Sequence, residues 1–324
     1  MPPNRRPRQY GDSNRAFLQA FMARSTLTVE EGQEILAEIL SVKEDKVIFP
    51  EDLAPEDLPN YIDIANSAIS PFDLEIRSAL PQVTDDNPPQ NLEETRVYAL
   101  VNTTSDNLTQ LATTFSADEI SFIRRVLDKM FDTNNTRLAE LMAVSSMEAI
   151  QLAKVNKDEN RRESGTQPGR TAGAAVSLTM TQAETVLRRL VDDGWFEKSL
   201  RSYYTLSPRA LMELKGWLVS TYNDDGERGR NGKIKFCAAC RDILTVGQRC
   251  ENRDCAGRLH DHCTRRSFRV QKAEQCPICK APWPGNKFVG ERATTTGGNR
   301  RGSNSNARRS GVAPATQAME VDSD

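Results

Sequence analysis

Outside one short segment, this chain has no cysteine and no histidine. All seven cysteines and both histidines of the 324 residues fall between Cys237 and Cys279. An odd number of cysteines, in a chain that does not open with a secretory hydrophobic region, argues against a framework of disulfides. We therefore expect these cysteines to bind metal ions in a reducing compartment.

The sequence also lacks a long apolar run and a strong net charge of either sign. Hydrophobic residues make up 38% of the chain, and its formal net charge is -2. No apolar run approaches the roughly 20 residues that a membrane-spanning helix needs. We expect a soluble intracellular protein without a membrane partner. Its length leaves room for roughly two small domains beside the cysteine-rich segment.

Eight Cys and His residues have the number and spacing of two structural zinc sites, each of which takes four ligands in a tetrahedron. The predicted ligands are Cys237, Cys240, Cys250, Cys255, His260, Cys263, Cys276 and Cys279. His262 is left out because it adjoins Cys263, where a shared metal would strain the backbone. The segment has few large apolar residues, so we predict that two zinc ions also supply its folding energy.

The chain before this segment begins with the pattern of helices followed by a hairpin. One helical face is formed by Phe17, Leu18, Phe21 and Met22. The capping box Thr28-x-x-Glu31 begins a second helix, and a third is expected over 58–68. Apolar residues then alternate with polar ones over 72–76 and 97–101, which predicts a hairpin. We predict a winged-helix domain over 13–103, after a flexible basic N-terminus over 1–12.

A second unit of the same kind is predicted over 104–223. Ser116-x-x-Glu119 predicts the start of a helix, and Leu138, Leu141 and Met142 predict that helical structure continues into another. A charged linker is expected near 156–174. Helices are then predicted from the cap Thr181-x-x-Glu184 to Gly194 and after Ser207-Pro208, with a short hairpin between them. The predicted helix over 182–193 carries no basic stripe, which favours protein over DNA as its partner.

The end of the chain is predicted to be a zinc domain over 235–285 and a disordered tail over 286–324. The tail is rich in Gly, Asn, Ser, Thr and Arg, a composition that cannot bury a core. Its arginine pairs at 300–301 and 308–309 have three open interpretations: a nuclear address, a phosphate-binding arm or solvated charge. The expected fold class is α+β, with two tandem winged-helix domains before a small two-zinc domain.

The order of four cysteines, one histidine and three cysteines resembles the cross-braced RING and PHD fingers. The resemblance implies one metal on Cys237, Cys240, His260 and Cys263, and another on Cys250, Cys255, Cys276 and Cys279. PHD fingers usually carry an aromatic residue two positions before the seventh ligand, where this chain has Glu274. RING domains carry a proline after the seventh ligand and often a cation after the eighth, which here are Pro277 and Lys280.

A RING resemblance implies a surface that holds a ubiquitin-conjugating enzyme and its ubiquitin, with no catalytic residue of its own. The contact residues that it implies are Pro277, Lys280, Ala238 and Trp283. Such a surface acts by orienting the thioester-linked ubiquitin for attack. Ala238 departs from the larger apolar residue that active RING domains usually have there. For Lys280, an ordinary solvated lysine remains the alternative.

Over about residues 14–284, the whole arrangement resembles the family of the first non-SMC element of the Smc five/six chromosome complex. Its most specific part is the variant RING, closed by Trp283-Pro284. The resemblance implies a nuclear, chromatin-associated ubiquitin ligase subunit that acts in DNA repair and recombination. It also implies a MAGE-like partner, which assists the ligase activity, and a kleisin-type partner. Contact with DNA, through the complex or the basic tail, is left open.

A second hypothesis of a different class is kept beside the ligase. In it, the chain is a non-catalytic assembly subunit, and its zinc domain is a protein-binding or stabilising surface. Ala238 and the lone cation Lys280 keep this alternative open.

Overall fold

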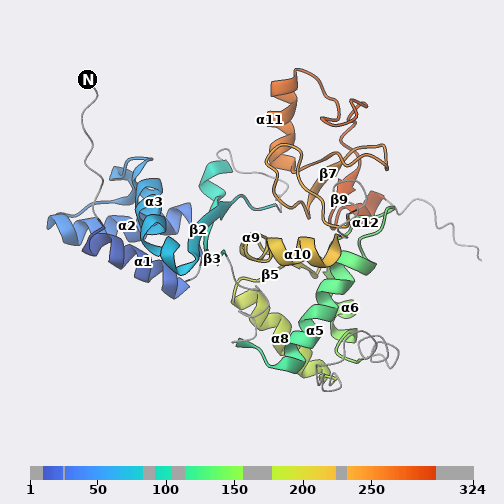
Figure 1. Ribbon diagram of the computed structural model, residues 1–324, viewed down its shortest axis with the longest axis horizontal. Helices are drawn as coiled ribbons and strands as arrows, with labels where there is room; N and C mark the ends of the chain where they lie inside the picture. Colours follow the sequence, from blue (N-terminus) through green and yellow to red (C-terminus); the bar gives the residue numbers. More distant parts are fainter. Residues whose placement is uncertain are drawn as a thin grey trace, which may run out of the picture.

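The computed structural model describes residues 10–24, 26–82, 92–103, 114–155, 177–223 and 232–296. It is a mixed structure of helices and small sheets, as predicted, and Figure 1 shows three parts around a central helix α9. We name them the first helical unit (10–103), the second helical unit (114–223) and the cysteine-rich module (232–296). No helix among the described residues is long and apolar enough to span a membrane.

The first helical unit packs three helices against a three-stranded antiparallel sheet of order β1-β3-β2. Its 3-10 helices are Pro50–Asp52, Ser70–Phe72 and Leu92–Thr95. Its other elements are α1 (Asp12–Arg24), β1 (Thr26–Thr28), α2 (Val29–Glu44), α3 (Asp57–Ile69), β2 (Leu74–Ala79) and β3 (Val97–Asn102). In the register of β2 and β3, Ile76 lies opposite Leu100. The predicted helices and hairpin are therefore present, whereas the short strand β1 was not predicted.

Local chemistry explains where these elements begin. The hydroxyl of Thr28 accepts a hydrogen bond from the Glu31 backbone at 3.2 Å, and the Glu31 carboxylate accepts one from the Thr28 backbone at 2.8 Å, so the predicted capping box is confirmed. Phe17 and Phe21 are fully buried, but Met22 is 58% exposed, so its place on the predicted apolar face is wrong. Phe72, predicted in the hairpin, lies before β2 and is 72% exposed.

The second helical unit has the same plan, with a sheet of order β4-β6-β5. A π-helical turn, Lys129–Thr133, extends the first of its helices. Its other elements are α5 (Ala117–Asp128), β4 (Val144–Ser145), α6 (Ser146–Gln151), α8 (Met180–Asp192), β5 (Phe196–Lys198), β6 (Tyr203–Leu206), α9 (Pro208–Glu213) and α10 (Lys215–Tyr222). The caps Ser116 and Ser207 are confirmed, and Gly194 has the positive φ of 72° expected after a helix.

Two helix predictions in this unit are corrected. Helix α8 is capped by Thr179 with Gln182, two residues before the predicted cap, because that pair also satisfies both backbone donors. Residues 138–142 are not helical. The Asn134 side chain donates instead to the Ala143 carbonyl at 2.8 Å, and Met142 has a φ of 42°. Asparagine side chains that bond to nearby backbone compete with helix formation, and here they hold a loop.

The cysteine-rich module contains a sheet of order β8-β7-β9 and one longer helix. Its elements are β7 (Gly247–Arg249), β8 (Arg258–Leu259), α11 (Asp261–Gln271), β9 (Phe288–Val289) and α12 (Ala293–Thr296). β9 and α12 correct the prediction of disorder from residue 286, because Val289 is fully buried and its strand pairs with β7. Residues 1–9, the whole of the predicted linker near 156–174, and the part of the predicted tail over 297–324 lie outside the described residues.

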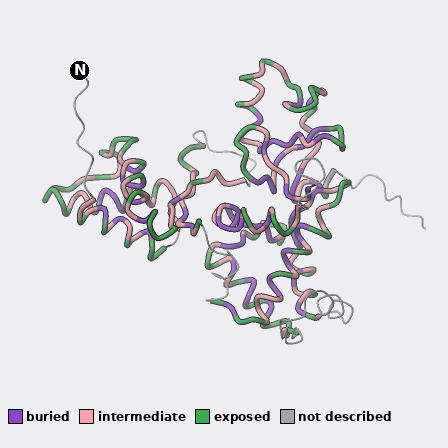
Figure 2. Tube along the Cα trace, in the orientation of Figure 1, coloured by how far each residue is buried: buried purple, intermediate pink, exposed green. Residues whose placement is uncertain are grey.

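The second helical unit and the cysteine-rich module share one hydrophobic core. Buried residues run continuously from Phe115 to Val289 in this core, and Figure 2 shows buried chain on both sides of the junction. Glu140, in the loop predicted to be helical, forms an ion pair with Arg258 whose side chains are only 7% and 2% exposed. The Glu140 carbonyl also accepts a hydrogen bond from Gly290 at 2.8 Å. The module is therefore held firmly on the second unit.

The first helical unit reaches the same module through Gln82, just after β2. The Gln82 amide nitrogen donates to the Ile243 carbonyl at 2.7 Å. Its amide oxygen accepts from the Thr245 backbone at 2.8 Å, and from the Thr245 hydroxyl and the Val246 backbone at 3.1 Å each. These four hydrogen bonds from one side chain place the end of β2 against residues 243–246, which lead into β7.

We expect Glu140→Ala to destabilise the protein by about 3–5 kcal/mol, because it leaves the buried Arg258 charge without its partner. Urea unfolding followed by tryptophan fluorescence measures the change. The matched control is Arg137→Ala, which removes an ion pair with Asp254 that joins the same two parts but is about four-fifths exposed. The control is expected to cost less than about 1 kcal/mol. Equal costs for the two variants would contradict the role assigned to Glu140.

Candidate metal centre

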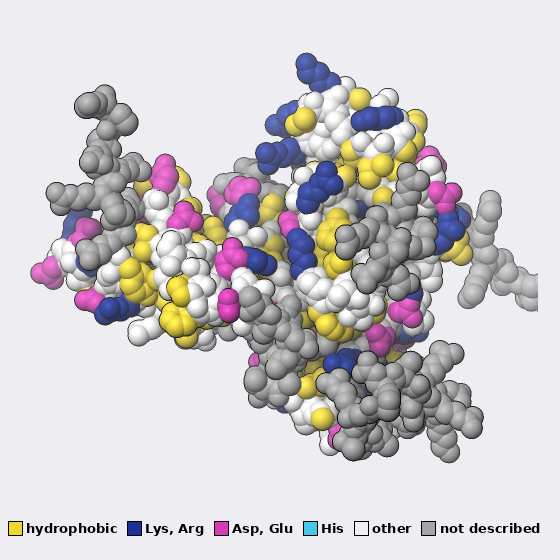
Figure 3. Space-filling model, viewed as in Figure 1, with side chains coloured by type: hydrophobic (Ala, Val, Ile, Leu, Met, Phe, Trp, Pro, Cys, Tyr) yellow, Lys and Arg dark blue, Asp and Glu magenta, His cyan; other side chains and the backbone are white. Residues whose placement is uncertain are grey.

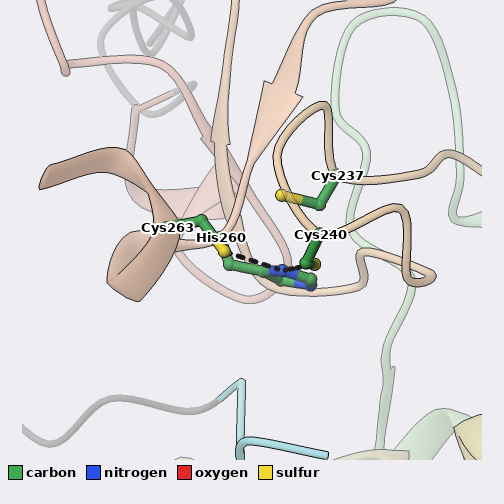
Figure 4. A group of neighbouring side chains, drawn as sticks. All are labelled: Cys237, Cys240, His260 and Cys263. Atoms are coloured by element: carbon green, nitrogen blue, oxygen red, sulfur yellow. Dashed lines mark hydrogen bonds between the residues drawn. The ribbon is translucent and has the colours of Figure 1, made fainter. Parts of the chain in front are cut away.

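The first four-ligand cluster joins a tight loop to the start of helix α11. Cys237 and Cys240 lie on a reversal closed by a bridge between Phe236 and Ile243, and the Arg241 backbone donates to the Cys237 carbonyl at 3.0 Å. His260 is the N-cap residue of α11, and Cys263 lies in its first turn. Figure 4 shows these two pairs of side chains facing each other. Their ligand atoms lie within 4.8 Å of one another.

His260 is oriented for metal binding by a carbonyl outside the cluster. Its Nε2 lies 3.2 Å from the Ile243 carbonyl oxygen, and its Nδ1 lies 3.3 Å from the Cys240 sulfur. If Nε2 donates its proton to the carbonyl, the lone pair of Nδ1 points into the cluster. Such an outer hydrogen bond fixes the tautomer and ring orientation of many metal-binding histidines.

The second cluster joins the loop after β7 to the turn before Trp283. It consists of Cys250, Cys255, Cys276 and Cys279, again within 4.8 Å of one another. The sulfurs of Cys250 and Cys279 are 3.5 Å apart, and those of Cys255 and Cys276 are 3.6 Å apart. These distances are far too long for disulfides, whose sulfurs are ~2.05 Å apart. They are close to the ~3.8 Å edge of a tetrahedron with metal–sulfur bonds of ~2.3 Å.

The donor set fits a soft or borderline metal ion at both positions. Seven of the eight donors are thiols, and all seven cysteines are free. Pairs of ligands from the two clusters alternate along the chain. Each cluster therefore joins two segments that are separated in the sequence by a ligand pair of the other cluster. This is the grouping that the resemblance to cross-braced fingers implies. Both clusters could therefore hold a metal ion and tie the loops of the module together.

The charges in the first cluster favour a bound cation. Hydrogen bonds from Cys240 and Cys263 lower the pKa of Cys237 because they stabilise its thiolate. Burial lowers the pKa of His260, but hydrogen bonds and charge from Cys237 and Cys240 outweigh burial and raise it to about 9. A proton on His260 thus takes the place of a bound cation, and metal and proton compete for the same atoms.

His262 lies beside this cluster without belonging to it. Its ring stacks on that of His260 with centroids 4.9 Å apart, and its Nδ1 makes no hydrogen bond among the described residues. Burial, together with the neighbouring His260, lowers the pKa of His262 to about 4. A neutral His262 can pack on the ligand ring without adding charge beside the metal position.

The residues predicted to contact a conjugating enzyme separate into a surface group and a buried one. Pro277 and Ala238 are half-buried, and Lys280 is exposed with its Nζ 3.4 Å from the Pro277 carbonyl. Trp283 is only 4% exposed, and its Nε1 donates to Gln248 at 2.9 Å. A direct contact by Trp283 is therefore corrected, because its ring packs on Phe268 inside the module.

Sequence reasoning missed the residues that hold the module on the helical units. Gln82 falls near the predicted hairpin tip, and Glu140 falls within a predicted helix. Gly257 was also missed, although a Cβ at this position would overlap the Cys276 sulfur. Its place between Cys255 and β8 is the one signal that could have drawn attention to it. Glycine is needed where a backbone approaches another group this closely.

Comparison with known proteins assigns both parts of the chain. The family model described as "Nse1 non-SMC component of SMC5-6 complex" matches residues 14–214, and that of a "RING-like domain" matches 237–279. The human "Non-structural maintenance of chromosomes element 1 homolog" is 24% identical over 273 residues, covering 84% of each chain. The Saccharomyces cerevisiae protein "Non-structural maintenance of chromosomes element 1" is 26% identical over 173 residues. This match covers 50% of this chain and 48% of the yeast protein.

A solved structure shares the fold. A chain of the structure titled "Nse1-Nse3-Nse4 complex" superimposes with a TM-score of 0.60 at 21% identity. The match covers 85% of this chain and 98% of that chain. The arrangement of helices, sheets and cysteine-rich module is thus that of a known fold.

We expect bound metal to leave both clusters as the pH falls from 7 to 4, because protons compete for thiolates and for His260. In the folded, metal-free cluster the pKa of His260 is about 9, so a proton competes with the metal for its ring throughout this range. Released metal is measured with a chromophoric chelator, and the accompanying loss of structure by near-ultraviolet circular dichroism, to which Trp283 contributes. Retention of both metal equivalents at pH 4 would contradict this prediction.

Gly257→Ala is expected to lower the metal content from two equivalents to about one, because the added methyl group displaces the Cys276 sulfur. Elemental analysis of the purified variant gives the stoichiometry. The matched control is Gly216→Ala, where an added Cβ meets no atom within 4 Å. The control should keep both equivalents, and a two-equivalent Gly257 variant would show that the second cluster tolerates the change.

Proposed function

This chain belongs to the family of Nse1 non-SMC components of the SMC5-6 complex, and we propose that it acts there as a RING-type ubiquitin ligase subunit. The observation that carries the proposal is the pairing of a matching RING-like segment with an exposed Lys280 beside Pro277. In this role the chain positions a ubiquitin-loaded conjugating enzyme and forms no covalent intermediate.

We propose zinc as the metal of both clusters, two ions in all. Thiolate and imidazole donors in closed four-ligand sites are typical of structural zinc. The ligands are Cys237, Cys240, His260 and Cys263 in one site, and Cys250, Cys255, Cys276 and Cys279 in the other. When bound, zinc supplies the cross-links that hold the loops carrying Ala238 and Pro277 in place.

The proposed conjugating-enzyme surface consists of Ala238, Pro277 and Lys280, with Ile278 beside them. Ile278 is 54% exposed, an unusual position for a large apolar side chain and one suited to a shallow protein contact. Lys280 has a φ of 62°, which turns the chain sharply after the last ligand. Its ammonium group can bridge two bound proteins by charge. Restricting the flexible thioester-linked ubiquitin lowers the entropic part of the barrier.

The helical units supply the proposed assembly role. We propose that both are winged-helix domains, with boundaries at 13–103 and 104–223, on the basis of helices followed by small antiparallel sheets. The solved structure of similar fold is titled as a complex with Nse3 and Nse4. By analogy, we propose a MAGE-like and a kleisin-type subunit as partners, in a nuclear chromatin-bound complex for DNA repair and recombination.

Two observations favour the alternative of a non-catalytic assembly subunit. The Lys280 ammonium group folds back toward the Pro277 carbonyl, and Ala238 offers little apolar surface because its side chain is a single methyl group. In that role the module stabilises the helical units and their partners.

The two functions are separated by ubiquitin discharge from loaded conjugating enzymes, measured with the chain alone and with its MAGE-like partner. We expect Lys280→Ala to slow discharge roughly tenfold while metal content stays at two, because the bridging charge is lost and the fold is not. The matched control is Lys287→Ala, another lysine of the module outside the proposed surface. No acceleration by the wild-type complex, over a broad enzyme panel, would favour the assembly role.

A further inference from the structure

Helix α11 carries a row of basic side chains that neither the fold nor the proposed ligase surface uses. Arg265 and Arg269 are exposed and lie four residues apart, on one side of the helix. Lys272, also exposed, follows as the C-cap residue with a φ of 54° and extends the row past the end of the helix. Figure 3 shows basic side chains gathered along the edge of the molecule where α11 lies. At 1.5 Å per residue, the row is about 10 Å long.

The opposite side of α11 fixes the row in space. Cys263 and Thr264 are buried, and the Phe268 ring packs on Trp283 with centroids 6.2 Å apart. Cys263 also belongs to the first metal cluster, so the helix is anchored at its first turn. The basic row therefore stands on an anchored helix, and little backbone entropy is lost when it meets a partner.

The charges of the row are not neutralised within the protein. Among the described residues, the side chains of Arg265, Arg269 and Lys272 form no ion pair, whereas Asp261 at the start of the same helix is paired with Arg292. The whole chain has a net charge of -2, so this concentration of positive charge is local. An aligned and unpaired set of cations fits an anionic partner with evenly spaced charges.

A double-helical nucleic acid fits the row better than other anionic partners do. Each strand of a duplex presents a phosphate about every 3.4 Å along its axis, so a row of about 10 Å spans several of them. Guanidinium groups bind phosphates in a bidentate manner. The row has no exposed aromatic residue on which single-stranded bases could stack. It also lacks the apolar face that membrane insertion requires and the apolar centre typical of protein interfaces.

We propose that Arg265, Arg269 and Lys272 form a binding surface for the phosphate backbone of duplex nucleic acid, read without regard to base sequence. Neither Pro277 nor Lys280 belongs to the row, and phosphate binding by the row needs no step of ubiquitin transfer. It would place the cysteine-rich module directly on the nucleic acid, with the helical units free to hold protein partners.

The test uses the full-length, metal-loaded chain and a fluorescent 20-base-pair DNA duplex, with affinity measured by anisotropy over a range of salt concentrations. The variant combines Arg265→Gln, Arg269→Gln and Lys272→Gln. Loss of three phosphate contacts is expected to reduce the slope of log affinity against log salt by about 2.7, and to weaken binding by at least roughly tenfold at 0.1 M salt. Metal content and helical circular dichroism should stay unchanged.

The matched control removes three exposed cations from the first helical unit by Arg24→Gln, Lys43→Gln and Lys46→Gln. It changes the net charge by the same amount and should leave the slope nearly unchanged. An equal effect of both triple variants would show that only net charge matters and would overturn the proposal. An unchanged slope in the α11 variant would do the same, because contacts would then come from other segments.

Competition experiments separate duplex nucleic acid from other anions. Unlabelled duplex should displace the probe at lower concentration, per charge, than a single strand of equal length, polyglutamate or vesicles of phosphatidylglycerol. Stronger competition by polyglutamate would indicate an acidic protein partner, and stronger competition by vesicles would indicate a membrane surface. Either result would overturn the assignment to a duplex.

Discussion

The two interleaved sets of four ligands are the constraint on which the C-terminal third of this protein depends. Cys237 and Cys240 are tied to the start of α11, while the loop after β7 is tied to the turn that carries Pro277 and Lys280. The ligand pairs alternate along the chain, so forming one cluster also positions the segments that carry the other cluster. Because the module has few large apolar residues, we expect metal binding and folding there to be one process. The proposed enzyme-binding surface and the basic row on α11 are both consequences of that process.

A buried ion pair helps to attach the module to the rest of the chain, independently of the metal clusters. The Glu140–Arg258 pair is almost fully shielded from water, so each charge depends on the other. Around it, one hydrophobic core continues from the second helical unit into the module. The module is thus packed on the second helical unit as part of the same core, and this packing fixes its orientation.

The sequence predicted the parts whose causes are local. Caps at Thr28, Ser116 and Ser207 are set by side chains within three residues, and the two Cys/His clusters are marked by a spacing that few other structures need. The errors lie where distant contacts decide. Residues 138–142 form a loop in which the Glu140 carbonyl accepts a hydrogen bond from Gly290 of the module. β9 is ordered because it pairs with β7. Neither partner is visible in the local pattern.

The four hydrogen bonds of Gln82 give the protein a thermodynamic link between its two ends. A ligand that binds the first helical unit and favours the position of Gln82 also favours the docked module. Binding free energies are reciprocal, so if such a ligand strengthens metal binding in the module, bound metal strengthens the binding of that ligand by the same factor. Loss of metal near the C-terminus would then be felt as weaker assembly at the N-terminal unit, although no contact there had been altered.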